Sequence, residues 1–331
     1  MIQQAKRTLG AVGIAALAAG AASLSNYFTT KYLVKMAVDH EAPKIMEKAE
    51  SVVEKSGRSI AGAQVDGAFL EDLYAASKRL AAREHEVLQI KSSDGTMLVG
   101  HWFPVENPKR VIIAMHGWRA SWHKDFGLVA DSYSAEGCSV LYAEQRGQNN
   151  SGGEYMGFGL TERYDCVDWV NAVNGKCGGE LPVYLCGVSM GATTVLMAAD
   201  LKLPKNVRGI IADCGFTSPA AIWKHVANNN LHITYGIRSV FADMLFREKN
   251  MVGLDDYSTV DALQNTDIPV LLIHGSDDHF VPVEMTYENY KACRSPKELL
   301  IVPGADHGMS YYVETEKYQA TVRNFWAKYD K

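Results

Sequence analysis

The sequence GVSMG at Gly187–Gly191 places Ser189 between two glycines, directly after the apolar run 181–186. A helix-forming stretch, 192–201, follows, so the serine would lie at a turn from a strand to a helix. This is the pattern of a nucleophile elbow, where a strained turn holds the serine Oγ above the end of a sheet. The flanking residues are glycines because a side chain there would collide with the strand or the helix. Ser189 is therefore the candidate nucleophile.

A serine nucleophile needs a base, and the base needs a carboxylate that orients it. Two later apolar runs, 268–274 and 299–302, have the pattern of buried strands that end in polar loops. The first loop carries Asp277 and Asp278, and the second carries His307. Because open α/β sheets bind ligands at the carboxyl ends of their strands, both loops would reach the same rim. We expect the histidine to be the base and one of the two aspartates to be the acid.

Other polar residues in these loops have structural interpretations. His274, at a strand end, and His116 are both interpreted as structural histidines. His279 is a weaker alternative for the base, and Asp306 is expected to shape the loop of the candidate base. A loop aspartate such as Asp277 commonly caps a turn or a helix.

From about Glu86 to Tyr329 the chain resembles the α/β-hydrolase superfamily, in its branch of esterases, lysophospholipases and serine aminopeptidase-like proteins. The resemblance rests on GVSMG, on HGSDDHFVP at 274–282, and on the H-G-x turn after the apolar run 110–115. The H-G-x-x-D-x-x-V-P spacing favours Asp278 over its neighbour as the acid. The resemblance thus implies a triad of Ser189, Asp278 and His307.

The same resemblance implies an oxyanion hole made of two backbone N–H groups. One belongs to Trp118 in the H-G-x turn, and the other to Met190, the residue after the nucleophile. The segment 144–153 is similar to a D-x-R-G-x-G-x-S motif of this branch, although Glu144 and Gln148-Asn149 depart from it. We expect Arg146 in that segment to form a buried structural ion pair. Residues 158–169 add a similarity to bacterial hydrolases with an N-terminal hydrophobic segment.

Eight strand-like segments are separated mostly by helical patterns, which predicts a mostly parallel, doubly wound α/β sheet. They are 87–90, 97–103, 111–115, 139–143, 183–186, 207–212, 270–274 and 299–302. The first two are expected to form an antiparallel hairpin at one edge. The resemblance implies the α/β-hydrolase fold, an eight-stranded sheet flanked by helices in a catalytic domain at 86–331.

A long insertion follows the sixth strand. About fifty residues precede Pro269, too many for a simple crossover. We expect a small helical cap at about 216–268. Its apolar residues would either line an acyl or aryl pocket or pack the cap onto the core, and both interpretations stay open. These residues are Trp223, Phe241, Met244, Leu245 and Phe246.

The N-terminus has the features of a targeting segment. Lys6 and Arg7 precede the apolar, alanine-rich run 9–24, which is marginally long enough to span a bilayer. We expect residues 1–30 to be a membrane anchor with the catalytic domain outside. A cleaved signal of a secreted protein and a soluble packing helix of a cytoplasmic one are the alternatives. Residues 31–85 are predicted to form a helical arm.

Composition narrows the partners. The chain has 331 residues and a net charge of −5, which gives no electrostatic reason to expect nucleic acid. Its six cysteines have no framework spacing, and no C-x-x-C pair or histidine cluster suggests a metal or a cofactor. We expect a serine hydrolase that cleaves carboxylic esters through an acyl-serine intermediate, with a small-molecule ester or amide as its substrate. A peptidase, an amidase or an acyltransferase on the same machinery is the alternative, and a non-catalytic binding protein of this fold is a more distant one.

Overall fold

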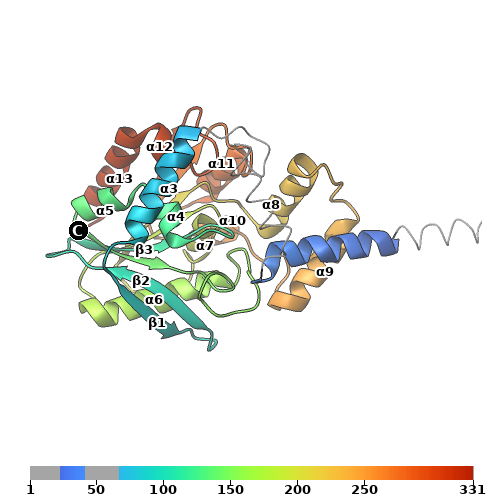
Figure 1. Ribbon diagram of the computed structural model, residues 1–331, viewed down its shortest axis with the longest axis horizontal. Helices are drawn as coiled ribbons and strands as arrows, with labels where there is room; N and C mark the ends of the chain where they lie inside the picture. The colour runs from blue at the N-terminus through green and yellow to red at the C-terminus, as the bar shows by residue number, and fades with distance from the viewer. Residues whose placement is uncertain (1–22, 42–66, 331) are drawn as a thin grey trace, which may run out of the picture.

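The computed structural model describes residues 23–41 and 67–330. Its centre is a single eight-stranded sheet with helices packed around it (Figure 1). The strands are β1 Glu86–Lys91, β2 Met97–Phe103, β3 Arg110–Met115, β4 Cys138–Ala143, β5 Val183–Val188, β6 Val207–Asp213, β7 Val270–Gly275 and β8 Lys297–Val302. Their order in the sheet is β1-β2-β4-β3-β5-β6-β7-β8. The β1–β2 and β2–β4 pairs are antiparallel, and the pairs from β4 to β8 are parallel. The predicted sheet and edge hairpin are confirmed.

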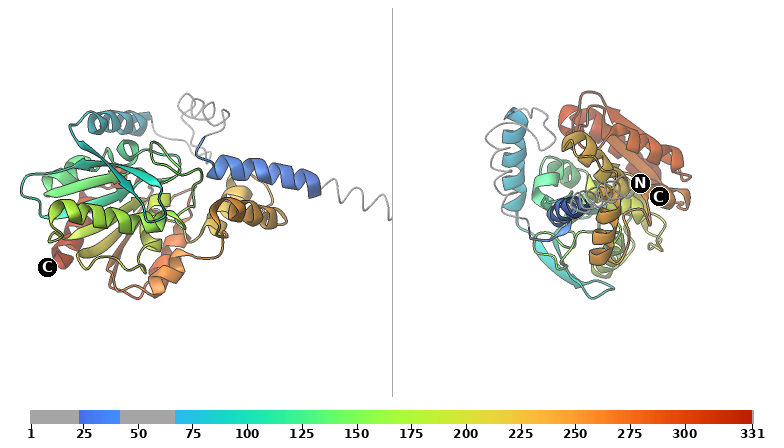
Figure 2. Two further views of the ribbon diagram at one scale, coloured as in Figure 1. Left: turned by 90° about the horizontal axis from the view of Figure 1, so that it is seen from below. Right: turned by 90° about the vertical axis from the view of Figure 1, so that its right-hand side faces the viewer.

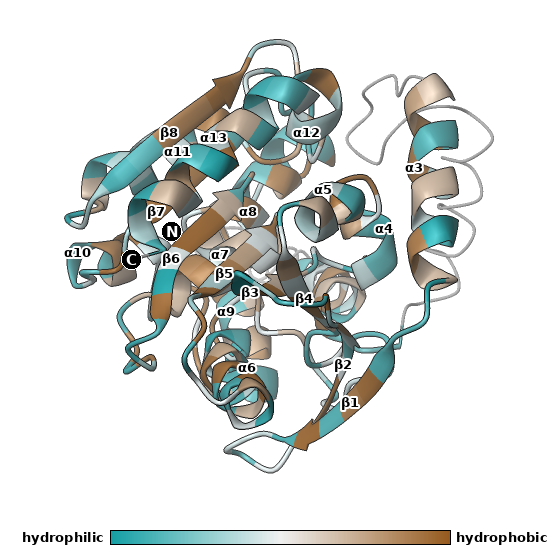
Figure 3. Ribbon diagram, turned by 90° about the vertical axis from the view of Figure 1, so that its left-hand side faces the viewer, coloured by the Kyte–Doolittle hydropathy of each residue, from teal (hydrophilic) through white to brown (hydrophobic). Residues whose placement is uncertain are grey.

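Helices cover both faces of the sheet, which explains why β3, β4 and β7 are buried along their whole length (Figure 3). One face packs on α6 Glu162–Cys177, α7 Met190–Met197 and α10 Thr259–Gln264. The other face packs on α4 Trp122–Phe126, α5 Ala130–Ala135 and α13 Thr315–Tyr329. The remaining helices of the sheet domain are α11 Val283–Ala292 and α12 Ser310–Val313.

The insertion after β6 is helical, as predicted. It contains α8 Pro219–His225, a π-helical turn at Val226–Asn230, α9 Arg238–Asn250 and α10. Ser218 begins α8 by accepting a hydrogen bond from the backbone of Ala221, and a capping box at Ser258 begins α10. The insertion therefore supplies a cap beside the carboxyl ends of the strands.

Two N-terminal helices lie against this body. Residues 23–38 are helical and run beside α9, as both views of Figure 2 show. The rings of Tyr27 and Phe241 meet there at 5.6 Å. The second helix, α3 Gly67–Ala81, packs on α4. Residues 1–22, which hold most of the predicted anchor, lie outside the described residues, and within 23–41 and 67–330 no helix has the length and apolarity of a membrane span.

Arg146 forms the expected structural ion pair and connects three segments of the chain. Its guanidinium donates to both carboxylate oxygens of Asp165 on α6, with Nε at 2.7 Å from Oδ2. Its Nη1 donates to Asp94, in the loop of the edge hairpin, at 2.6 Å. The loop after β4 is thereby fixed to the hairpin and to α6.

We expect Arg146→Ala to lower the free energy of unfolding by about 3–5 kcal/mol, because it leaves the buried Asp165 carboxylate without its counter-ion. Urea denaturation of the two proteins measures this difference. Arg247→Ala is the matched control, since its ion pair with Asp256 is exposed and should shift the midpoint little. Equal shifts in the two variants would contradict the structural role of Arg146.

Candidate active site

Ser189 lies at the turn between β5 and α7 with φ 55° and ψ −119°, a strained conformation for a residue with a side chain. Its backbone N–H donates to the carbonyl of Asp213 at 2.9 Å, which holds the turn against β6. A Cβ on Gly191 would lie 1.9 Å from the carbonyl oxygen of Met115, and one on Gly187 would lie 2.2 Å from that of Gly191. Both glycines are therefore required for this turn.

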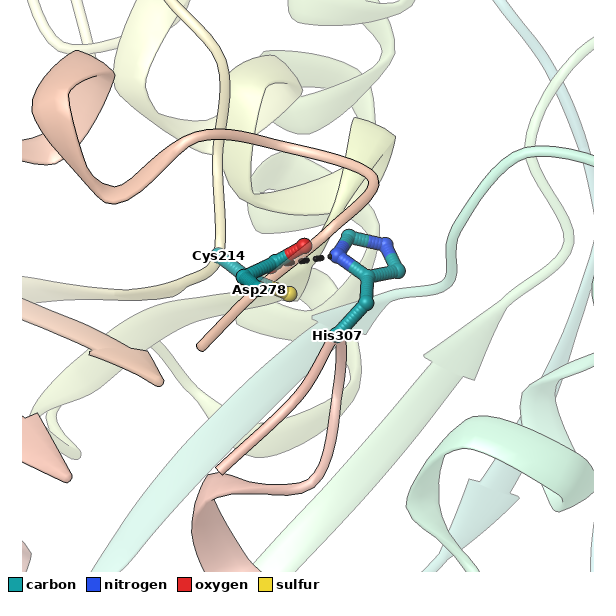
Figure 4. Close-up of side chains that lie close together, drawn as sticks. All are labelled: Cys214, Asp278 and His307. Atoms are coloured by element: carbon teal, nitrogen blue, oxygen red, sulfur yellow. Dashed lines mark hydrogen bonds and ion pairs between the residues drawn. The ribbon is translucent and has the colours of Figure 1, made fainter. Parts of the chain in front are cut away.

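Three loops bring Ser189, His307 and Asp278 into one chain of hydrogen bonds. His307 Nε2 lies 2.9 Å from the Oγ of Ser189. His307 Nδ1 lies 2.7 Å from Oδ2 of Asp278, the contact drawn in Figure 4. The loops follow β5, β7 and β8, so the carboxyl ends of three parallel strands deliver the three groups. This geometry allows a proton to move from Oγ to Nε2 while the carboxylate holds Nδ1–H.

The carboxylate of Asp278 is fully buried and well supplied with donors. It accepts the backbone N–H groups of Phe280 and Val281 at 2.9 and 2.8 Å, and His274 Nε2 lies 3.1 Å from its other oxygen. Burial raises the pKa of Asp278, but the two neighbouring histidines outweigh it and hold the pKa well below its usual range. The group is therefore a carboxylate at neutral pH. Asp277 instead accepts from the hydroxyl of Ser276 on an exposed loop.

Burial lowers the pKa of His307, whereas the buried carboxylate of Asp278 raises it, and the net direction is upward from 6.5. A base must be neutral to accept a proton, so activity should be lost as the pH falls through this raised pKa. We expect kcat/KM for an activated ester to rise with pH, with a midpoint above 6.5. A pH profile from 5 to 10 measures it, and a flat profile or a midpoint below 6 would contradict the prediction.

The two amides expected to form an oxyanion hole lie beside the nucleophile. A Cβ on Gly117 would be only 3.3 Å from that of Ser189, which places the Trp118 turn against it, and Met190 follows the serine directly. Across the part of the chain that the structure describes, neither the Trp118 N–H nor the Met190 N–H donates to a protein acceptor. Both are therefore available to a bound oxygen.

Asp125 holds the turn that carries Trp118. Its Oδ2 accepts the N–H of Gly117 at 2.7 Å. Burial raises the pKa of this carboxyl group, and this hydrogen bond opposes the shift. Sequence reasoning missed Asp125, because no motif surrounds it and its partner lies in a different element.

The alternative residues have other contacts. His116 is buried, with Nδ1 donating to the carbonyl of Gly117 and Nε2 accepting from Gln145, so its role is structural. His274 is also buried, between Thr286 and the candidate acid. His279 is exposed and lies by Asp306. Asp306 accepts the backbone N–H of His307 and shapes that loop, as expected.

Cys214 adds a thiol to the site. Its sulfur, a carboxylate oxygen of Asp278 and a ring nitrogen of His307 lie within 4.8 Å of one another (Figure 4). These are possible metal ligands, but a metal would have to displace the hydrogen bond between the carboxylate and the imidazole. Burial raises the pKa of Cys214 to about 11, so the group is a neutral thiol and a weak ligand.

Two cavities open beside Ser189. The larger, of about 370 Å³, lies between α3, α4 and the His307 loop, and Lys124, Asp306 and His307 are part of its wall. The smaller, of about 210 Å³, lies under the cap. Ser189, Trp118 and Phe280 line both cavities. The nucleophile therefore stands at the junction of two binding spaces.

The five apolar cap residues named from the sequence divide between the two interpretations, a pocket lining and a packing surface. Trp223 lines the smaller cavity, whereas Leu245 and Phe246 are buried in the cluster that joins the cap to the core. The ring of Phe241 packs on Tyr27, and Met244 is exposed. Of these five residues, Trp223 is therefore the one that lines a cavity beside Ser189.

Helix 23–38 reaches the same site. The indole Nε1 of Trp118 donates to the carbonyl of Ala37 at 2.7 Å. The guanidinium of Arg119 donates to the carbonyls of Met36 and Asp39 at 2.8 and 2.7 Å. These contacts satisfy carbonyls that the end of a helix leaves unpaired. This helix crosses the predicted boundary between the anchor, 1–30, and the arm, 31–85. Sequence reasoning expected the arm to pack beside the hydrolase domain and assigned no chemistry to it.

Solved structures of similar shape establish the fold. The chain superposes on the Pyrococcus furiosus esterase Pf2001 with a TM-score of 0.61 and 21% identity, over 77% of this chain and 95% of that one. A puromycin-hydrolyzing peptidase of Mycobacterium tuberculosis gives a TM-score of 0.57 and 16% identity, over 75% of this chain and 39% of that one. The predicted α/β-hydrolase fold is confirmed.

Sequence comparison identifies the family. Residues 124–331 match the prolyl oligopeptidase family, Peptidase_S9. The protein YqkD of Bacillus subtilis is 29% identical over 193 residues, 57% of this chain, and the match spans 62% of YqkD. The chain belongs to the prolyl oligopeptidase family and is a serine hydrolase.

Proposed function

We propose that the protein hydrolyses carboxylic esters through an acyl-serine intermediate, with Ser189, His307 and Asp278 as its catalytic triad. The observation that carries the proposal is the pair of contacts of His307, 2.9 Å to the hydroxyl and 2.7 Å to the carboxylate. The strained turn at the serine supports it, because such strain concentrates at functional sites.

In the acylation step, Oγ of Ser189 bonds to the carbonyl carbon while Nε2 of His307 takes its proton. The N–H groups of Trp118 and Met190 stabilise the negative oxygen, and each such donor contributes about 2.7–4 kcal/mol. The C–O bond to the alcohol then breaks, and His307 returns the proton to the leaving oxygen. Asp278 remains ionised and holds the imidazolium.

In the second step, a water molecule attacks the acyl carbon as His307 takes one of its protons. The bond to Oγ breaks, Ser189 regains a proton from the same nitrogen, and the free acid departs. Attack by an alcohol or an amine in place of water would make the enzyme an acyltransferase. Product analysis with and without an added acceptor separates these two outcomes.

Amide cleavage is the second candidate function. It is favoured by the family, and the puromycin-hydrolyzing peptidase has the same fold, whereas the similarity to the Pyrococcus esterase and the apolar cavity under the cap favour esters. A panel of p-nitrophenyl esters beside aminoacyl amides tests the choice. Turnover of the amides alone would overturn the ester assignment.

A further inference from the structure

We propose that the cavity under the cap binds the acyl chain of the substrate, with helix 23–38 as one wall. The substrates would be esters of medium- to long-chain apolar acids. This inference rests on the proposed function and names the substrate class of the same site.

The wall of this cavity is apolar and comes from three parts of the chain. Helix 23–38 contributes Leu33 and Val34, the cap contributes Ile222, Trp223 and Ala227, and the loop after β6 contributes Phe216. Among the described residues of the lining, hydroxyl or charged side chains are limited to Thr30, Ser189, Tyr235 and Arg238. Binding of an apolar chain to such a surface is favourable because it removes the chain's methylene groups from water.

The position of His307 assigns the two cavities to the two halves of an ester. The leaving oxygen must receive a proton from Nε2 of His307, so the alcohol must lie on that side of Ser189. His307 belongs to the wall of the larger cavity and not to the wall of the cavity under the cap. The acyl chain is therefore directed under the cap, and the larger cavity, with Lys124 and Asp306, receives the alcohol.

Helix 23–38 is fixed in place as a wall. Val34 and Val38 are 2% and 0% exposed and belong to one cluster with cap residues such as Phe246. The carbonyl of Ala37 accepts from Trp118, and Asp39 pairs with Lys249 of α9 at 2.9 Å. Figures 1 and 2 show the helix alongside the cap. The helix thus joins the cap to the turn that carries a proposed oxyanion donor.

The first test uses the full chain and p-nitrophenyl esters from acetate to octanoate. Each buried methylene should raise kcat/KM by up to about fourfold until the cavity is full. We expect the octanoate-to-acetate ratio of kcat/KM to be at least about tenfold for the wild type. A wild type that turns over acetate and shows no preference for octanoate would overturn the acyl site.

The second test narrows the cavity from two parts of its wall, with Leu33→Trp on helix 23–38 and Ala227→Trp on the cap. Each should lower the octanoate-to-acetate ratio at least about tenfold, because the added ring occupies the space of several methylenes. Tyr32→Trp and Val240→Trp are matched controls on the same helix and on the cap. These residues are 47% and 68% exposed and lie outside the lining, so the variants should keep the wild-type ratio.

Thermal unfolding identifies a narrowing variant that fails to fold, and the octanoate-to-acetate ratio of the other narrowing variant then decides the test. An unchanged ratio in a folded narrowing variant would overturn the acyl site. The proposed function would survive, provided that Ser189→Ala still abolishes acetate turnover. Absence of turnover of every ester would overturn the proposed function and this inference together.

Discussion

Ser189→Ala is expected to lower kcat for p-nitrophenyl acetate by about 10⁴–10⁶-fold. The hydroxyl is the proposed attacking group, and its Oγ lies 2.9 Å from the base. Without it, His307 can activate only water, and the remaining rate comes from substrate binding and the oxyanion donors. The loss should appear in kcat, because the substitution removes the covalent step and leaves both cavities intact. Initial rates with saturating ester measure it.

Covalent labelling by a fluorophosphonate gives an independent measure of the same prediction. The wild type should be labelled once, at Ser189, and the alanine variant should not react. Ser134→Ala, on the exposed side of α5, is the matched control and should keep both activity and labelling. Labelling of the folded Ser189→Ala variant would assign the nucleophile to another residue.

Asp278→Asn is expected to lower kcat by about 10⁴-fold, because the amide can hold His307 in the wrong tautomer. In the present structure the carboxylate accepts from Nδ1 at 2.7 Å, which leaves Nε2 free to take the serine proton. An asparagine that donates to Nδ1 would put the ring proton on Nε2. The fall in kcat of a purified variant measures the effect.

Asp277→Asn is the matched control, because it makes the same chemical change one residue away. Its carboxylate is exposed and contacts Ser276, so the rate should stay within about twofold of the wild type. Thermal unfolding of both variants shows whether the fold is retained, since Asp278 also accepts from two backbone N–H groups. Equal losses of kcat in the two variants would contradict the assignment of Asp278, and not Asp277, as the acid.

Much of the fold follows from local patterns. Short apolar runs such as Val111–Met115 and Val183–Cys186, separated by helical patterns, predicted the central strands, because a strand buried on both faces must be apolar along its length. The edge strand β1 is mostly exposed and has no such run. The hairpin at β1 and β2 was predicted from its turn residues. The order of the strands in the sheet was not predicted, because pairing between distant strands leaves no pattern in either strand, and it is known only from the structure.

The candidate residues were found where chemistry imposes a local pattern. Gly187 and Gly191 mark Ser189 because only glycine fits the turn, and that requirement is visible in five consecutive residues. The acid was less certain, because Asp277 and Asp278 differ by one position in a loop. The direction of each carboxylate depends on how the loop after β7 closes on His307, and the structure turns Asp278 inward.

The sequence by itself therefore determined the strands, the elbow and the set of polar residues at the sheet edge, because each depends on neighbours along the chain. Tertiary structure alone decided that Asp125 holds the Gly117 turn, that Cys214 lies beside His307, and that helix 23–38 borders the cavity under the cap. The physical reason is that these contacts join segments far apart in the chain. Burial and hydrogen bonding across such distances leave no periodicity or motif in either segment.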